Sequence, residues 1–189
     1  MSSFTGGEVP GVAEAESVVV PAATDESRKW SKVSETNLPV EGDRLHAKVD
    51  GRYITIFRHG GKLSCIDAIC HHAGGPLTLG PLKDIEDLNM TVVLCPWHKF
   101  MVSIDGGLKA YQGVTFVDGK PVNTGWKVGK VVQRPHYVVE RESGVYVALH
   151  LTDAPCTSDN DAYSALCVQD YDIHSEVETG LSDTEVAAL

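Results

Sequence analysis

Short runs in which apolar and polar residues alternate occupy the middle of the chain, and residues typical of turns separate them. These β-prone runs lie at 44–49, 52–57, 62–66, 91–94, 101–104, 130–140 and 144–151. Asp50-Gly51 joins the first two runs and is typical of a tight β-hairpin, while Pro135 places its run at a sheet edge or a bulge. A helical turn is expected over 82–90. Short strands at close spacing predict an all-β fold, either a sandwich or a barrel.

Composition divides the 189 residues into a central domain and two ends. Residues 1–27 are rich in Gly, Ala, Ser, Val and Glu without a sustained period, so we expect a flexible N-terminal segment. Residues 28–155 carry the β-prone runs and form the predicted domain. Residues 156–189 contain acids but no Lys or Arg, which predicts an acidic, flexible C-terminal tail.

Charge and hydropathy argue against several classes of protein. The net charge is −10 and the chain has no basic stripe, so we do not expect nucleic-acid binding. No apolar run approaches the roughly 20 residues that a membrane-spanning helix needs. The acidic N-terminal segment lacks the basic residues of a secretory or organelle-targeting signal. We therefore expect a cytoplasmic protein whose five cysteines are reduced.

Two pairs of soft metal ligands stand out against this background. One residue separates Cys70 from His72, two residues separate Cys95 from His98, and each pair follows a β-prone run. Because Gly or Pro accompanies both pairs, we expect them on turns that leave one sheet and can face each other. Structural zinc sites usually take two Cys or two His from one loop, whereas one of each suits a two-iron cluster. A zinc-stabilised binding module is the remote alternative.

The two runs CHHAGGPL and CPWHK together resemble the Rieske [2Fe–2S] signature. The long gap between the runs and the downstream run GWKVGKVVQRPHYV make the chain similar to the small soluble Rieske-domain proteins of eukaryotes. The similarity extends from about Trp30 to about Cys167. It implies a Rieske-type fold, an antiparallel β sandwich that carries a small cluster-binding subdomain, over residues 28–155.

The resemblance implies one [2Fe–2S] cluster per chain, with Cys70 and Cys95 on one iron and His72 and His98 on the other. Glycines after the first pair would let the backbone N–H groups approach the bridging sulfides. Trp97 is expected to shield the cluster from water. The residues expected around the ligands are Gly74, Gly75, Pro76, Trp97 and Lys99.

The resemblance also implies a low reduction potential. Rieske proteins of respiratory complexes have a disulfide between the two loops, where this chain has Gly75 and Trp97. They also have Ser and Tyr hydroxyls near the cluster, where this chain has Phe100 and Val102, which cannot donate hydrogen bonds. Fewer hydrogen bonds to sulfur predict a midpoint near the lower end of the range of about −150 to +300 mV.

The other histidines and cysteines lack ligand spacing. His71 is expected at the surface between two ligands, and Cys65 as a small buried residue of a strand. Cys156 and Cys167 are expected to be free thiols. The histidines expected to be ordinary strand or loop residues are His46, His59, His136, His150 and His174.

These features predict an electron carrier and not an enzyme, because the chain has no room for the second, mononuclear iron domain of a Rieske oxygenase. Family resemblance implies a reductase upstream and an oxygenase-type or hydroxylase-type acceptor downstream, docking near the tip that His72 and His98 form. We expect the carrier to be a monomer. A regulatory or structural subunit that uses a Rieske fold to bind a larger protein is the alternative.

Overall fold

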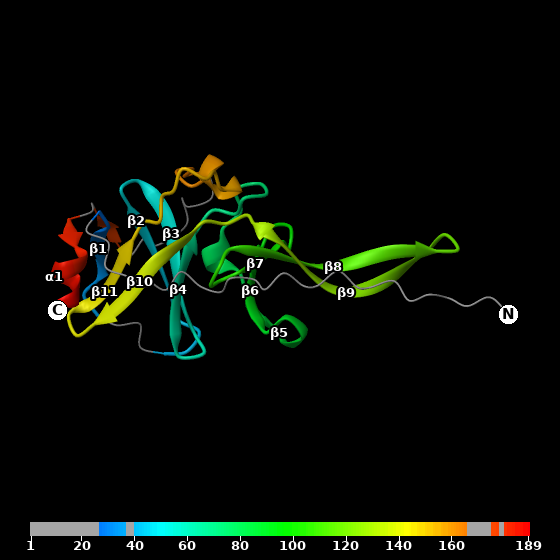
Figure 1. Ribbon diagram of the computed structural model, residues 1–189, viewed down its shortest axis with the longest axis horizontal. Helices are drawn as coiled ribbons and strands as arrows, with labels where there is room; N and C mark the ends of the chain where they lie inside the picture. Colours follow the sequence, from blue (N-terminus) through cyan, green and yellow to red (C-terminus); the bar gives the residue numbers. More distant parts are fainter. Residues whose placement is uncertain (1–26, 37–39, 166–174, 178–179) are drawn as a thin grey trace.

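The computed structural model describes residues 27–36, 40–165, 175–177 and 180–189, and these residues are almost entirely β (Figure 1). An eight-stranded sheet has the order β12-β2-β3-β4-β10-β11-β1-β13, and a five-stranded sheet has the order β5-β6-β7-β8-β9. Paired strands are antiparallel apart from β12 and β2, which are parallel. The all-β prediction is confirmed.

The strands of the larger sheet are β1 (Lys29–Ser34), β2 (Arg44–Val49), β3 (Arg52–His59), β4 (Lys62–Asp67), β10 (Pro135–Arg141), β11 (Gly144–Ala148), β12 (Ser175–Val177) and β13 (Leu181–Ser182). Those of the smaller sheet are β5 (Leu82–Ile85), β6 (Met90–Leu94), β7 (Met101–Ser103), β8 (Leu108–Val117) and β9 (Lys120–Val131). The short helices are η1 (Leu77–Leu79), η2 (Glu86–Leu88), η3 (Thr157–Asn160) and α1 (Asp183–Ala187).

The predicted hairpin between β2 and β3 is confirmed. Asp50 and Gly51 have φ angles of +46° and +79°, the left-handed conformation that a two-residue turn of this kind requires. Alternate residues of β3 then face opposite sides of the sheet. Ile54 and Ile56 belong to the main core, whereas Phe57 belongs to a second core beneath the smaller sheet.

The second core contains Cys70 and Cys95, two of the four predicted metal ligands. Its other buried members come from both sheets, from the short helix η1 and from residues next to the ends of β7 and β9. The buried members besides the cysteines are Phe57, Ile66, Leu77, Val93, Val102, Ile104 and Val132. Cys95 directly follows β6, and Cys70 follows β4 after two intervening residues, so both cysteines lie where a loop leaves the packed interior.

Strands β8 and β9 form a long ribbon that projects from the rest of the molecule (Figure 1). The pattern of short runs did not predict this ribbon, because its exposed positions are frequently apolar. Phe116, close to the tip, is 71% exposed. The other exposed large apolar residues of the ribbon are Tyr111, Val114, Val117, Val122, Val128 and Val131.

Two local predictions are corrected by the structure. The segment 82–90 begins with strand β5 and continues with the short helix η2, so only part of the segment is helical. Pro135 lies neither at an edge nor at a bulge; it is the first residue of β10, a strand in the middle of the larger sheet. A first position tolerates proline because the missing N–H lies at the end of the hydrogen-bond ladder.

The C-terminal residues that the structure describes pack on the larger sheet, and the prediction of a flexible tail over 156–189 stays a prediction. Strand β13 pairs with β1, and Val186 of α1 is buried. The carboxylate of Asp183 accepts hydrogen bonds from Trp30 Nε1 (2.5 Å) and Arg28 Nη1 (2.9 Å). Both partners are distant in sequence, and Arg28 balances the charge of this buried carboxylate. The domain boundaries themselves stay predictions.

Within the described ranges, no helix is long and apolar enough to cross a membrane. Apart from Ser27, the predicted N-terminal segment lies outside these ranges, and so do Cys167 and His174. Cys65 is buried in β4, as predicted, and Cys156 is a free thiol.

Candidate metal centre

The loop 70–75 follows β4 by two residues and is closed by its own backbone. The Cys70 N–H donates to the Gly75 carbonyl (2.8 Å), and the Gly74 N–H donates to the Cys70 carbonyl (2.9 Å). Gly74 has a φ of +75°, which favours glycine. The N–H groups of His72 and Ala73 donate to the Cys70 sulfur. The loop thus holds Cys70 inward and leaves His72 exposed.

The loop 95–100 follows β6 and repeats this arrangement. The Cys95 N–H donates to the Phe100 carbonyl (2.8 Å), and the Lys99 N–H donates to the Cys95 carbonyl (2.9 Å). Lys99 has a φ of +60°, so it takes the conformation that Gly74 takes in the other loop. The N–H groups of Trp97 and His98 donate to the Cys95 sulfur. The two loops are therefore equivalent in backbone as well as in ligand type.

The two loops bring the four predicted ligands together as a cysteine pair and a histidine pair. The buried thiols of Cys70 and Cys95 are hydrogen-bonded to each other. The exposed rings of His72 and His98 lie edge to face, with centroids 4.9 Å apart. The site therefore offers sulfur on its inner side and imidazole nitrogen on its outer side.

The cysteine pair shares a proton unequally. The hydrogen bond from Cys70, assisted by N–H groups of its own loop, lowers the pKa of Cys95 to about 6. The same hydrogen bond, together with burial, raises the pKa of Cys70. Cys95 is thus close to the thiolate form that binds metals, and metal binding would displace the proton on Cys70.

The residues present fit a Rieske-type [2Fe–2S] cluster. Across the part of the chain that the structure describes, no three His, Cys, Asp or Glu side chains surround one ion position. The candidates form two pairs, and this cluster type takes two Cys on one iron and two His on the other. Gly75 keeps the space open, because a Cβ atom there would lie 2.6 Å from Cys95 Sγ and 3.2 Å from the Trp97 ring.

Aromatic rings border the histidine pair. The Phe100 ring stacks on His72 with centroids 4.0 Å apart, and Lys109 Nζ lies 5.1 Å from the centre of the Phe100 ring. Trp97 is 51% exposed and meets His98 edge-on. Stacking by Phe100 restricts the orientation of His72, a contact that the sequence analysis missed.

The remaining predicted neighbours of the ligands also lie in or beside the two loops. Pro76 forms an isolated β-bridge with Ile69 just outside the first loop. The Lys99 side chain turns back to donate to the Pro96 carbonyl (3.2 Å). Whether Gly74, Gly75, Pro76, Trp97 and Lys99 tune a bound cluster stays a prediction.

Buried polar residues that sequence reasoning missed form hydrogen bonds around the backbone that leads from β4 into the first loop. The carboxylate of Asp67, the last residue of β4, accepts hydrogen bonds from Arg52, His136 and Ser158. The side chain of Gln133 contacts the same stretch of backbone. The one sequence signal was the group of polar residues Gln133, Arg134 and His136 inside an otherwise apolar strand pattern.

His71 differs from its expected surface position, because it is half-buried and lies edge-on to Phe100 with ring centroids 5.6 Å apart. Burial lowers the pKa of His71. His136 is also more than an ordinary strand residue: it is fully buried, its Nδ1 accepts from the His150 N–H, and its Nε2 donates to Asp67. Burial lowers the pKa of His136, so the neutral ring is favoured.

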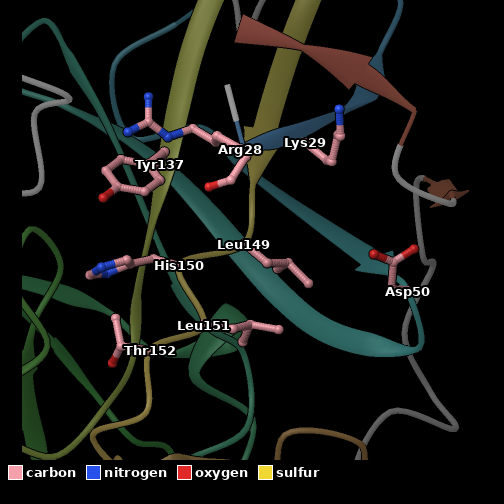
Figure 2. Close-up of a pocket in the computed structure, with 9 residues that line it drawn as sticks. Arg28, Lys29, Asp50, Tyr137, Leu149, His150, Leu151 and Thr152 are labelled. Atoms are coloured by element: carbon pink, nitrogen blue, oxygen red, sulfur yellow. The ribbon is translucent and has the colours of Figure 1, made fainter. Parts of the chain in front are cut away.

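A separate pocket of about 390 Å³ lies against β1 and β10 (Figure 2). Its lining includes the Arg28 side chain, whose guanidinium carbon lies 4.2 Å from the centre of the Tyr137 ring, and His150 beside that ring. No lining residue belongs to either ligand loop. The candidate metal centre is therefore a feature of the two loops and not of this pocket.

Comparisons with known proteins show which family of sequences this chain is similar to. A family model described as soluble Rieske-type ferredoxin matches residues 34–152. A human Rieske domain-containing protein is 32% identical over 148 residues, which covers 76% of this chain and 89% of that protein.

Two solved structures are also similar. The ferredoxin of carbazole 1,9a-dioxygenase from Nocardioides aromaticivorans is 20% identical with a TM-score of 0.44, covering 64% of this chain and 97% of that chain. A chain from a complex of reduced oxygenase and oxidized ferredoxin in carbazole 1,9a-dioxygenase is 19% identical with a TM-score of 0.46. The match covers 65% of this chain and 97% of that chain.

Proposed function

Because the chain belongs to the soluble Rieske-type ferredoxin family, we propose that it is a one-electron carrier that holds a single [2Fe–2S] cluster. One observation carries this proposal. Two loops with the same backbone hydrogen bonds bring two buried cysteines and two exposed histidines together. This arrangement supports Cys70 and Cys95 as ligands of the inner iron, and His72 and His98 as ligands of the outer iron.

The ligand set determines what the site can do. When bound, the cluster supplies one reversible electron, and with two thiolates, two sulfides and two Fe³⁺ its oxidised form is neutral. Burial of Cys70 and Cys95 excludes water from the inner side, and the N–H groups of each loop point at the sulfur atoms. Exposure of His72 and His98 leaves a short path for the electron to a docked protein.

The partners we propose are a reductase upstream and an oxygenase-type or hydroxylase-type acceptor downstream. Both would dock at the tip around His72 and His98, which supports electron entry and exit at one place. We further propose that the protein works in the cytoplasm as a monomer, without enzymatic activity of its own.

We also propose a midpoint potential near the lower end of the Rieske range of about −150 to +300 mV. Phe100 stacks on His72, and Val102 is packed in the second core, so neither offers a hydroxyl to a cluster sulfur. A redox titration with a midpoint above about +100 mV would contradict this proposal.

The test is metal and sulfide analysis of protein made in iron-replete cells, followed by reductive titration. The proposal requires two irons and two acid-labile sulfides per chain, reduced by one electron. Cys70→Ser should abolish the cluster, whereas Cys65→Ala, a change at a buried cysteine away from the loops, should retain it. Stoichiometric zinc without sulfide would overturn the proposal in favour of a zinc-binding module.

A further inference from the structure

Gln133 lies between β9 and β10 and is completely buried. Its side chain makes three hydrogen bonds to the backbone that leads into the first ligand loop. Nε2 donates to the carbonyls of Asp67 (2.9 Å) and Ile69 (2.6 Å), and Oε1 accepts from the His71 N–H (3.1 Å). This one side chain therefore binds the backbone of two residues before Cys70 and of one residue after it.

The backbone of Gln133 is hydrogen-bonded to the turn that follows β7, the strand that leads out of the second ligand loop. The N–H groups of Val132 and Gln133 both donate to the Gly107 carbonyl (2.9 and 3.1 Å). Gly107 ends the turn after β7, and β7 directly continues the loop 95–100. A Cβ atom on Gly107 would lie 1.7 Å from the Gln133 carbonyl oxygen, so the two segments are in close contact.

The chemistry of this position selects a primary amide. Two carbonyl oxygens require two N–H donors, and the His71 N–H requires an acceptor at the other end of the same group. A glutamate carboxylate would place negative charge against both carbonyls. An aliphatic side chain would leave buried backbone groups without partners, which is costly.

We propose that Gln133 is a positioning residue that fixes the spacing of the two ligand loops. Its Oε1 accepts from the His71 N–H, and the next two N–H groups along the chain, those of His72 and Ala73, donate to the Cys70 sulfur. Its effect on a cluster rests on the proposed function, but its hold on the first loop does not.

The test compares Gln133→Leu and Gln133→Glu with Gln112→Leu, a matched change at an exposed position of the ribbon. Val147→Ala, a cavity in the main core away from both loops, controls for lost stability. The readouts are the EPR spectrum of the reduced protein, its midpoint potential, and hydrogen exchange of peptides covering 67–73. If Gln133→Leu does not fold, Gln133→Asn, which keeps the amide but shortens its reach, takes its place.

Both Gln133 variants should change the EPR spectrum and the midpoint, and should speed exchange in 67–73 by roughly tenfold, since a buried hydrogen bond is lost. Gln112→Leu and Val147→Ala should leave the spectrum and midpoint unchanged. A Gln133→Leu protein that is destabilised like Val147→Ala but has the wild-type spectrum and midpoint would overturn the proposal. If the wild type lacks iron, the proposed function fails, and unchanged exchange in Gln133→Leu would then overturn the positioning role separately.

Discussion

Asp67→Asn should be among the most destabilising single polar changes in this domain. The Asp67 carboxylate is fully buried and accepts from Arg52 Nε (2.6 Å), Arg52 Nη2 (2.6 Å) and His136 Nε2 (3.0 Å), and from the Ser158 hydroxyl. Breaking a buried ion pair by removing one partner costs about 3–5 kcal/mol. Because Arg52 retains its ion pair with Asp159, we expect the lower end of that range.

The magnitude can be measured by urea unfolding of the holoprotein at pH 7. A loss of about 3 kcal/mol corresponds to a fall in Tm of about 6–12 °C for a chain of this size. The matched control is Glu140→Gln, which breaks the more exposed ion pair with Arg58 and should cost less than about 1 kcal/mol. Equal losses for Asp67→Asn and Glu140→Gln would refute the argument that burial sets the cost.

The same network predicts how stability depends on pH. Burial lowers the pKa of His136, so the unfolded chain takes up a proton that the folded chain refuses as the pH falls below about 6.5. Burial alone would raise the pKa of Asp67, but hydrogen bonds from His136 and Arg52 outweigh it and lower that pKa. Stability should therefore fall first below about pH 6.5 and again below about pH 4.

In Asp67→Asn the second step should shrink, because the carboxylate that titrates there is gone. A Tm that is constant between pH 7.5 and pH 5 would contradict the role given to His136. An acid limb below pH 4 that is as steep in Asp67→Asn as in the wild type would contradict the role given to Asp67.

Three further changes test other parts of the fold. Asp183→Ala removes the acceptor of Trp30 and Arg28 and should cost about 2–3 kcal/mol, with faster amide exchange in β13; an unchanged exchange rate would show that the C-terminus is held by other contacts. A second change replaces residues 115–122 with Asn-Gly, which joins the paired residues Val114 and Asn123 by a two-residue turn. The free energy of unfolding should change by less than about 1 kcal/mol, and the iron content should stay the same. Loss of iron would show that the tip of the ribbon supports the site. Gly107→Ala should destabilise strongly, because its Cβ would clash with the Gln133 carbonyl, while Gly119→Ala, with a similar φ and open space, should cost about 1 kcal/mol; similar losses would refute the clash.

The sequence predicted the local features of this molecule well. The hairpin at Asp50-Gly51 depends on two adjacent residues, so a short pattern carries enough information to predict it. The spacing of Cys70 and His72 is an equally short pattern, and the role of these two residues as metal ligands stays a prediction. The hydrophobic pattern likewise predicted the all-β class, because short β-prone runs separated by turn residues suit strands and are too short for helices.

Features that depend on distant contacts could not be predicted in this way. Gln133 meets Ile69 from 64 positions away, and Asp183 meets Trp30 from 153 positions away. An acid-rich composition indicates solvent exposure on average, but it does not show which carboxylate finds a buried partner. The ribbon of β8 and β9 was not predicted because its apolar residues lie on the surface, whereas an apolar residue in the sequence is normally expected in a core.

The central claim is that His72 and His98 bind one iron of a [2Fe–2S] cluster whose other iron is bound by Cys70 and Cys95. The most direct measurement is pulsed EPR of the reduced protein labelled with ¹⁵N-histidine. The account predicts two strongly coupled histidine nitrogens in the wild type and one in each of His72→Cys and His98→Cys. A spectrum without strongly coupled nitrogen, or one that is unchanged in both variants, would contradict it.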